Sequence, residues 1–275
     1  MSSAVQTTGT RTDFAMNAVE RAQYAASGYV VRERVFSRRE CAGIAEDCER
    51  LMAELIAQPR GKIIKTGSFI FEQRPQIETT VKWESQAEDL IRGLEPFAHL
   101  SAALNDWGLD PRLTEPCQTI CDADDVVLFT EKLNLKRAQR GGEIQLHQDV
   151  PYWEFSPVSA RIATAMIFLD DTNLANGCLE VAPGSHKARV KYAQRTDVTG
   201  FDTLRMDDKK FDTSGMIALE VPAGSVAFFD AWLVHRSGPN KTDGDRRALL
   251  YSYQPAGNAH SRELLRPRWK DKSVG

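Results

Sequence analysis

The sequence lacks the features that mark several large classes of protein. No run of about 18 apolar residues occurs in its 275 residues, so no transmembrane helix is expected. The first ten residues have no apolar core and do not read as a secretory signal. A formal charge of −3 argues neither for nucleic acid nor for an anionic membrane surface as a partner. Hydrophobic residues at 42% and charged residues at 27% are ordinary values for a soluble globular protein.

Cysteine is scarce, and its spacing is uninformative. No Cys-x-x-Cys pair occurs, and an odd number of cysteines in a chain of this length argues against both a disulfide framework and a structural zinc site. The five are Cys41, Cys48, Cys117, Cys121 and Cys178. We therefore expect reduced thiols and a cytoplasmic location. Separately, we expect a monomer or homodimer.

One segment, residues 143–153, contains the pair His147-x-Asp149 together with further polar and aromatic residues. Side chains two residues apart on a β-strand point to the same face, so an imidazole and a carboxylate here form two corners of a metal site. The third corner is best supplied by His235. Two histidines and one carboxylate on one side of an ion leave other positions open, which is the arrangement of non-haem Fe(II) oxygenases.

A candidate anion clamp follows the third ligand. Arg246 begins a stretch, residues 246–253, whose alternation predicts a strand. Its guanidinium offers a planar fork for a carboxylate such as the outer carboxylate of 2-oxoglutarate.

Together these segments resemble the phytanoyl-CoA dioxygenase family of Fe(II)/2-oxoglutarate oxygenases. The resemblance spans roughly residues 127–253, and its segments follow in the family's order: Lys132–Lys136, His147–Trp153, Asn176–His186 and His235–Arg246. It implies a double-stranded β-helix, or jelly roll, with an all-β core and flanking helices (α+β). We expect one domain, residues 1–275, made of a flexible tail (1–13), a helix-rich part (14–125) and the jelly-roll core (126–256).

The resemblance implies a site as well as a fold. Fe(II) would be held by His147, Asp149 and His235, with 2-oxoglutarate and O2 as co-substrates and ascorbate as the reductant in vitro. The outer carboxylate would pair with Arg246, assisted by Ser237. Decarboxylation to succinate and CO2 would be coupled to hydroxylation of the substrate. Asp149 argues against halogenation, because related halogenases have a small residue there, whereas desaturation, epimerisation and ring closure remain open.

Other pocket residues are less sharply indicated. Lys132 and Asn134 share a strand face that faces solvent by default, and the resemblance turns this face toward the co-substrate. Thr164 is the polar residue within the apolar segment 161–170, and its hydroxyl bonds either to nearby backbone or to the co-substrate. Substrate contacts are expected from Gln145, Tyr152, Trp153 and Phe71, although the aromatic residues also suit core packing. His186, in a Gly-Ser-His turn, is expected to be structural.

The substrate is expected to be a small polar metabolite or a biosynthetic intermediate, because no basic cluster suited to coenzyme A is recognisable. An acyl-CoA hydroxylase is the alternative enzyme. A cupin-like protein that binds metal and ligand without turnover would have no use for Arg246 and Ser237. A zinc hydrolase would need a general base, and none adjoins the motif.

The remaining segments are expected to form scaffold. Ser37 and Glu40 form a capping box for a helix through about residue 57, with one face formed by Ile44, Leu51, Leu55 and Ile56. Residues 187–216 read as a long charged insertion, and residues 258–275 as a tail that folds back over the barrel. Further expectations are helices over 14–26, 86–94 and 97–104, a strand pair or flap over 61–71, and strands over 28–35, 127–136, 161–170 and 221–229.

Overall fold

The computed structural model describes residues 13–66, 69–84, 87–153, 161–190, 192–194, 204–206 and 211–271. The expected tail, residues 1–13, lies outside them apart from Asp13. Among the described helices, none is long and apolar enough to cross a membrane. The helices are α1 (Ala18–Ser27), α2 (Arg38–Ala57), α3 (Ala102–Gly108), α4 (Pro111–Cys121) and α5 (Ser261–Asp271), with 3-10 helices η1 (Pro75–Ile77), η2 (Ala98–Leu100), η3 (Val150–Trp153) and η4 (Ser185–Lys187).

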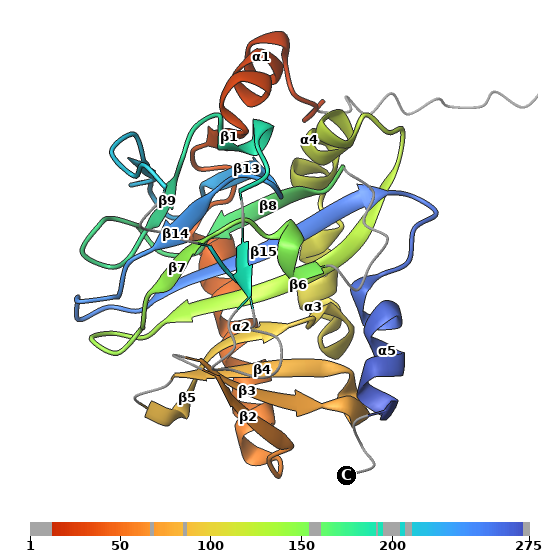
Figure 1. The fold of residues 1–275 in the computed structure, drawn as a ribbon, viewed down its shortest axis with the longest axis vertical. Coiled ribbons are helices and arrows are strands. Elements are labelled where there is room, and N and C mark those ends of the chain that lie inside the picture. Colours follow the sequence, from red (N-terminus) through yellow and green to blue (C-terminus); the bar gives the residue numbers. More distant parts are fainter. Residues whose placement is uncertain are drawn as a thin grey trace, which may run out of the picture.

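Two antiparallel sheets face each other, as expected for a double-stranded β-helix (Figure 1). The large sheet has the order β1 (Tyr29–Arg32), β13 (Val226–Asp230), β8 (Ala163–Phe168), β15 (Arg246–Pro255), β6 (Val126–Lys136), β5 (Ala87–Glu95), β4 (Thr79–Glu84), β3 (Phe69–Arg74) and β2 (Lys62–Thr66). The small sheet has the order β12 (Ile217–Ala218), β9 (Leu179–Val181), β14 (His235–Ser237) and β7 (Ile144–His147). A hairpin of β10 (Tyr192–Gln194) and β11 (Leu204–Met206) falls within the expected insertion.

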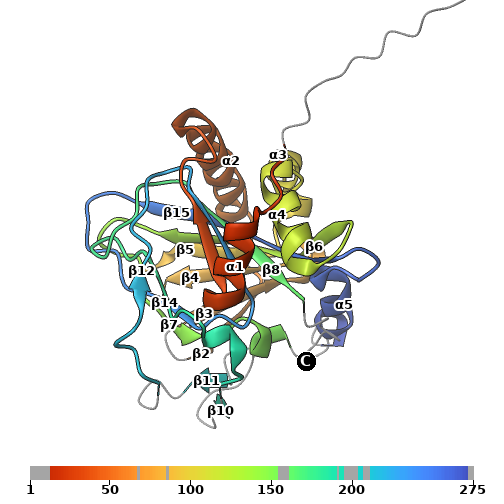
Figure 2. The ribbon, with the colours of Figure 1, turned by 90° about the horizontal axis from the view of Figure 1, so that it is seen from above.

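The central strands of the large sheet are buried on both faces, whereas its edge strand β2 is largely exposed. Figure 2 shows α2, α3 and α4 on one side of the large sheet and the small sheet on the other. Strand β8 displays the alternation that this requires, because Ala165 and Ile167 belong to the core beneath the helices whereas Met166 and Phe168 belong to the core between the sheets. A strand buried on both faces reads as continuously apolar, as residues 161–170 do.

Helix α2 begins as the sequence predicts. The Ser37 hydroxyl accepts the Glu40 N–H at 3.2 Å and the Glu40 carboxylate accepts the Ser37 N–H at 2.7 Å, which completes the capping box. Ile44, Leu51 and Leu55 are buried, but Ile56 is 53% exposed and does not belong to the packed face.

The helix expected over residues 86–94 is wrong. That segment is β5, which pairs with β4 on one side and with β6 on the other, where Gly93 lies opposite Asn134 and Leu94 opposite Leu133. Its residues favour helix locally, and hydrogen bonding to two neighbouring strands overrides that preference. The helix expected over 97–104 is η2 followed by α3, and α4, which starts at Pro111 after the N-cap Asp110, was not predicted.

The C-terminal helix α5 packs against β6. His260 anchors it, because its Nε2 lies 2.9 Å from the buried Glu131 carboxylate while its Nδ1 accepts the N–H of Arg262 at 3.0 Å. Arg262 and Arg266 reach Glu78 at the end of η1. The C-terminal segment therefore folds back onto the barrel.

Candidate metal centre and pocket

His147 and His235 meet across the small sheet. They are direct partners in the antiparallel pair of β7 and β14, and their ring centroids are 4.1 Å apart. Cross-strand partners point to the same face of a sheet, so the pairing itself brings the two rings together. Asp149 does not share the strand as expected, because β7 ends at His147 and Asp149 lies in the turn before η3, where its N–H donates to the Ala231 carbonyl at 3.0 Å.

The three side chains converge on one point. One ligand atom from each lies within 4.8 Å of the others. The Nδ1 atoms of His147 and His235 lie 2.8 and 2.9 Å from the carbonyl oxygens of Gln145 and Leu233. A carbonyl can only accept, so each Nδ1 carries the proton and each Nε2 keeps a free lone pair.

The protonation states suit a divalent metal. Burial lowers the pKa of His147 to about 3, helped by the neighbouring His235, and burial also lowers the pKa of His235. Burial opposes ionisation of Asp149, but Lys132 and the two histidines outweigh it and lower the pKa of this carboxyl. At neutral pH the cluster therefore presents two neutral imidazoles and a carboxylate, the forms that bind metal.

Asp149 leaves one oxygen for a ligand. Its Oδ1 accepts a hydrogen bond from the Lys132 ammonium at 2.7 Å, whereas Oδ2 is buried and has no hydrogen-bond partner among the described residues. A buried, unpaired carboxylate oxygen is costly, and a metal ion would supply its partner. The donor set of two nitrogens and one oxygen fits Fe(II).

A cavity of about 230 Å³ adjoins the cluster. Eleven of the twelve sequence-predicted site residues line it: Phe71, Lys132, Asn134, Gln145, His147, Asp149, Tyr152, Trp153, His235, Ser237 and Arg246. Thr164 does not line it. It lies further along β8, fully buried, with its hydroxyl 2.8 Å from that of Ser252. His186 packs beside Tyr24, with ring centroids 6.5 Å apart, and is not part of the metal cluster.

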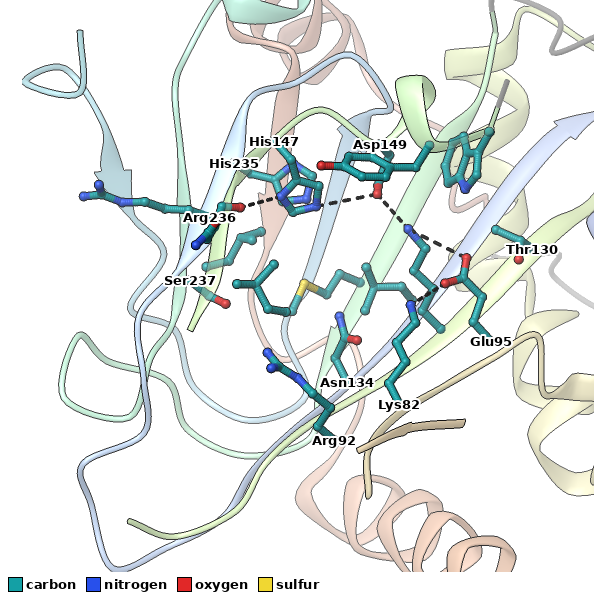
Figure 3. Close-up of a pocket in the computed structure, with 18 of the residues that line it drawn as sticks. Lys82, Arg92, Glu95, Thr130, Asn134, His147, Asp149, His235, Arg236 and Ser237 are labelled. Carbon is teal, nitrogen blue, oxygen red and sulfur yellow. Dashed lines mark hydrogen bonds and ion pairs between the residues drawn. The ribbon is translucent and has the colours of Figure 1, made fainter. Parts of the chain in front are cut away.

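One end of the cavity is built for an anion. Arg246 is buried, and one of its Nη atoms donates to the Gly177 carbonyl at 3.0 Å while its Nε has no hydrogen-bond partner in the described part of the chain. Burial lowers the pKa of Arg246 to about 10, so it remains a cation at neutral pH. Ser237, on β14, also lines the cavity (Figure 3), and the next residue, Gly238, packs against Gly177, whose carbonyl binds Arg246. A carboxylate would satisfy the guanidinium.

A second buried cation lies opposite Arg246. Lys136 is its direct partner across β6 and β15, and its Nζ donates to the Gly142 carbonyl at 2.5 Å. Burial, together with Arg246 and Arg92, lowers the pKa of Lys136 to about 6. The alternation of β6 indicated that Lys136 shares the face of Lys132, but its place beside Arg246 requires the register of β15.

The other end of the cavity carries a chain of ion pairs that the sequence did not reveal. Lys82 Nζ lies 2.6 Å from Glu95 Oε2, and Lys132 Nζ lies 3.9 Å from Glu95 Oε1 and 2.7 Å from Asp149 (Figure 3). The Lys132 ammonium also lies 4.8 Å from the centroid of the Trp153 ring. Lys82 lies on β4 and Glu95 at the end of β5. Because the sequence analysis expected a helix over 86–94, it did not predict the pairing of β4 with β5 that brings these two residues to the pocket.

Comparisons with known proteins identify a matching family model and related sequences. The model of one protein family, described as Phytanoyl-CoA dioxygenase (PhyH), matches residues 24–248. A probable alpha-ketoglutarate-dependent hypophosphite dioxygenase of Stutzerimonas stutzeri is 28% identical over 247 residues, covering 88% of this chain and 79% of the relative. An ectoine dioxygenase of Bordetella parapertussis is 25% identical over 258 residues, covering 89% and 77%.

A solved structure has the same fold. EctD from S. alaskensis, crystallised with 2-oxoglutarate and 5-hydroxyectoine, superposes with a TM-score of 0.69 at 23% identity, covering 91% of this chain and 80% of that one.

Proposed function

This chain belongs to the phytanoyl-CoA dioxygenase family of Fe(II)- and 2-oxoglutarate-dependent oxygenases, and on that premise we propose that it hydroxylates an unactivated C–H bond of a small polar metabolite or biosynthetic intermediate. Succinate and CO2 are the co-products. Iron and 2-oxoglutarate are its cofactors, and a His-Asp-His cluster is present.

The metal ligands in this proposal are His147, Asp149 and His235. The observation that carries it is their convergence within 4.8 Å, with Asp149 Oδ2 buried and unpaired within the described structure. Iron bound here supplies the activation of O2 that couples decarboxylation of the keto acid to oxidation of a C–H bond. The backbone carbonyls of Gln145 and Leu233 orient the two imidazoles, and Lys132 orients the carboxylate.

For 2-oxoglutarate we assign the outer carboxylate to Arg246 and Ser237. The unpaired Nε and the burial of Arg246 support this assignment. Asn134 lines the cavity and is assigned to the co-substrate, whereas Lys132, bonded to Asp149 at 2.7 Å and near Glu95, is assigned to the opposite end. Thr164 is not assigned a co-substrate contact, because its hydroxyl is bonded to Ser252.

The dimensions of the cavity favour a small substrate over an acyl-CoA thioester. About 230 Å³ accommodates the keto acid beside a small metabolite. Gln145, Tyr152, Trp153 and Phe71 line it and are assigned to the substrate. The names of the relatives, hypophosphite dioxygenase and ectoine dioxygenase, likewise denote small polar compounds.

We further propose a single catalytic domain, a cytoplasmic location and a monomer or homodimer. All five cysteines are free and buried, which suits a reducing compartment.

Succinate release tests the function. The full chain is incubated with Fe(II), ascorbate, 2-oxoglutarate and a panel of small metabolites, and succinate is measured with and without each of them. Substrate-dependent succinate together with a product heavier by one oxygen supports hydroxylation, whereas a product lighter by two hydrogens indicates desaturation or ring closure, and an isomer indicates epimerisation.

A second measurement separates the enzyme from its rivals. Anaerobic addition of Fe(II) and 2-oxoglutarate is expected to give a visible charge-transfer band. A folded protein that binds Fe(II) and gives no such band would be a cupin-like binder or a zinc hydrolase instead.

A further inference from the structure

We propose that the end of the cavity away from Arg246 is a subsite for a negatively charged, acceptor-rich group of the substrate, formed by Thr130, Ser261 and Lys132 and braced by Glu95 and Lys82. This inference rests on the proposed function, since it places a substrate beside the metal cluster. It specifies the substrate further, as a compact molecule that carries a carboxylate, phosphonate or sulfonate group.

Two buried hydroxyls at this end have no hydrogen-bond partner within the described residues. Thr130 and Ser261 line the cavity and are 1% and 2% exposed, and neither Oγ1 of Thr130 nor Oγ of Ser261 has a hydrogen-bond partner among the residues that the structure describes. Asp149 Oδ2 and Arg246 Nε, which face the proposed iron and 2-oxoglutarate, are in the same condition. An unsatisfied buried hydroxyl is destabilising, so a partner outside the protein is expected.

The two hydroxyls are held in place by one anchor. Thr130 precedes Glu131 on β6 and Ser261 follows His260 at the start of α5, and Glu131 and His260 are joined at 2.9 Å. Glu131 is fixed in turn by the N–H groups of Phe97 and Ala98, at 3.2 and 2.7 Å. The hydroxyls therefore project from a braced junction and not from a loose loop.

A hydroxyl close to Thr130 does not satisfy it. Ser252 is the cross-strand partner of both Thr130 and Thr164, and its hydroxyl is bonded to that of Thr164 at 2.8 Å. Thr164 is thus a matched reference for Thr130. Both are buried threonines on the inner face of the large sheet, but one is paired and lies outside the cavity while the other is unpaired and lines it.

The charges at this end favour an anion. Lys82 pairs with Glu95 at 2.6 Å, and Lys132 bridges Asp149 Oδ1 at 2.7 Å and Glu95 at 3.9 Å. With a divalent metal ion on Asp149 Oδ2, the positive charges at this end outnumber the two carboxylates, and the two unpaired hydroxyls add hydrogen-bond donors. Leu265 and Trp153 supply apolar wall beside it, which suits a short alkyl link between the anionic group and the reacting carbon.

This end lies apart from the co-substrate end. Figure 3 shows Thr130, Glu95 and Lys82 across the pocket from Ser237 and Arg236, with His147 and Asp149 between the two groups. Ser261 and Leu265 also lie beyond residues 24–248, which the family model matches. The subsite is therefore formed partly by a segment outside the shared core, where individual specificity is expected.

Calorimetric titration of the full chain tests the subsite. The protein is loaded with Fe(II) and saturating 2-oxoglutarate under nitrogen, so that Arg246 is occupied, and titrated with butyrate, butyramide and butylammonium. Butyrate is expected to bind at least about tenfold more tightly than the neutral amide, and the ammonium is expected not to bind. Equal binding of butyrate and butyramide, or no binding of butyrate, ethylphosphonate or ethanesulfonate at millimolar concentration, would overturn the proposal.

Variants locate the binding. Thr130→Val and Ser261→Ala are each expected to weaken butyrate binding about tenfold while the dissociation constant of 2-oxoglutarate, titrated first in the same samples, stays unchanged. Thr164→Val is the matched control and should leave butyrate binding intact. Wild-type butyrate affinity in the first two variants, or an equal loss in all three, would refute the assignment. Melting curves identify any variant that fails to fold. Thr130→Ser, which keeps the hydroxyl that Thr130→Val removes, is expected to bind butyrate as the wild type does.

The two proposals fail in different ways. A wild-type chain that does not bind 2-oxoglutarate contradicts the proposed function. The butyrate titration is then performed without 2-oxoglutarate. If the subsite exists, butyrate affinity still falls in Thr130→Val and Ser261→Ala and stays unchanged in Thr164→Val.

Discussion

His147 and His235 occupy opposing positions of two antiparallel strands, so the metal cluster is set by strand register. A shift of one residue in that pairing would turn one ring away from the other. The small sheet therefore fixes the two imidazoles, and Asp149 is fixed separately by the hydrogen bond from its N–H to the Ala231 carbonyl.

Replacing either imidazole should disable metal binding and leave the fold intact. For His147→Ala and His235→Ala we expect affinity for Fe(II) or Mn(II) to fall more than about 100-fold, since even changes to groups behind metal ligands cost 10–100-fold. Metal titration by calorimetry measures this. His186→Ala, which removes a histidine beside Tyr24, serves as the control, and an equal loss there would refute the ligand assignment.

Removing the buried guanidinium should affect the keto acid first. Arg246→Gln is expected to raise the KM for 2-oxoglutarate about 10–100-fold, because a charge-assisted hydrogen bond contributes roughly 1.5–3 kcal/mol. Arg247→Gln is the control, since the neighbouring Arg247 pairs with Asp170 at 2.7 Å and does not line the cavity. An unchanged KM for Arg246→Gln would mean that another cation binds the carboxylate.

Lys132 should control the pH range of metal binding. Its ammonium helps to lower the pKa of Asp149 against the effect of burial. In Lys132→Met that pKa rises, so protons compete with the metal up to a higher pH. Metal affinity measured against pH should show its acid limb displaced upward relative to wild type, while Lys132→Arg should stay near wild type. Identical acid limbs would contradict this role.

Lys136 should take up a proton when 2-oxoglutarate binds. Its pKa in the folded protein is about 6, so it is neutral at pH 8, and a carboxylate arriving at Arg246 favours its charged form. Affinity for 2-oxoglutarate should therefore fall as pH rises above about 6. Calorimetry in two buffers of different ionisation enthalpy counts the protons, and Lys136→Met should abolish the uptake. A wild-type protein that takes up none would refute the coupling.

The same residue predicts how stability depends on pH. Between pH 6 and the ordinary lysine pKa of 10.5, the unfolded chain binds this proton and the folded chain does not. Stability therefore rises with pH across that window. Thermal melts of the chain without co-substrate check the sign, because the slope should be smaller in Lys136→Met.

The sequence predicted the parts of the site that lie on strongly patterned strands. Alternation places Lys132 and Asn134 on one face of β6, and the family resemblance turned that face toward the cavity. The pair His147 and Asp149 was identified by its spacing together with the motifs that follow it, although Asp149 lies beyond the end of β7. The long apolar segment 161–170 likewise contains β8, because a strand that is buried on both faces consists almost entirely of apolar residues.

What escaped prediction depends on long-range pairing. Glu95 was not predicted as a pocket residue, because β5 has helix-forming residues and becomes a strand only between β4 and β6. Ser261 reaches the cavity only because His260 binds Glu131, a contact between segments far apart in the chain. Thr164 was given a candidate role from its polarity, but its distance along β8 from the cavity is not encoded in a local pattern.

The join between β5 and β6, with register partners at Gly93 and Leu94, connects the outer strands of the large sheet to the jelly-roll core. In the proposed assignment the metal ligands and the keto-acid clamp lie on the jelly-roll side of that join, together with the substrate residues of β6, β7 and η3. Lys82 and Glu95 come from beyond it, and Ser261 comes from the C-terminal helix. Exchanging the outer strands and that helix between relatives is thus expected to alter the anion-binding part of the substrate pocket while leaving the metal ligands and the clamp in place.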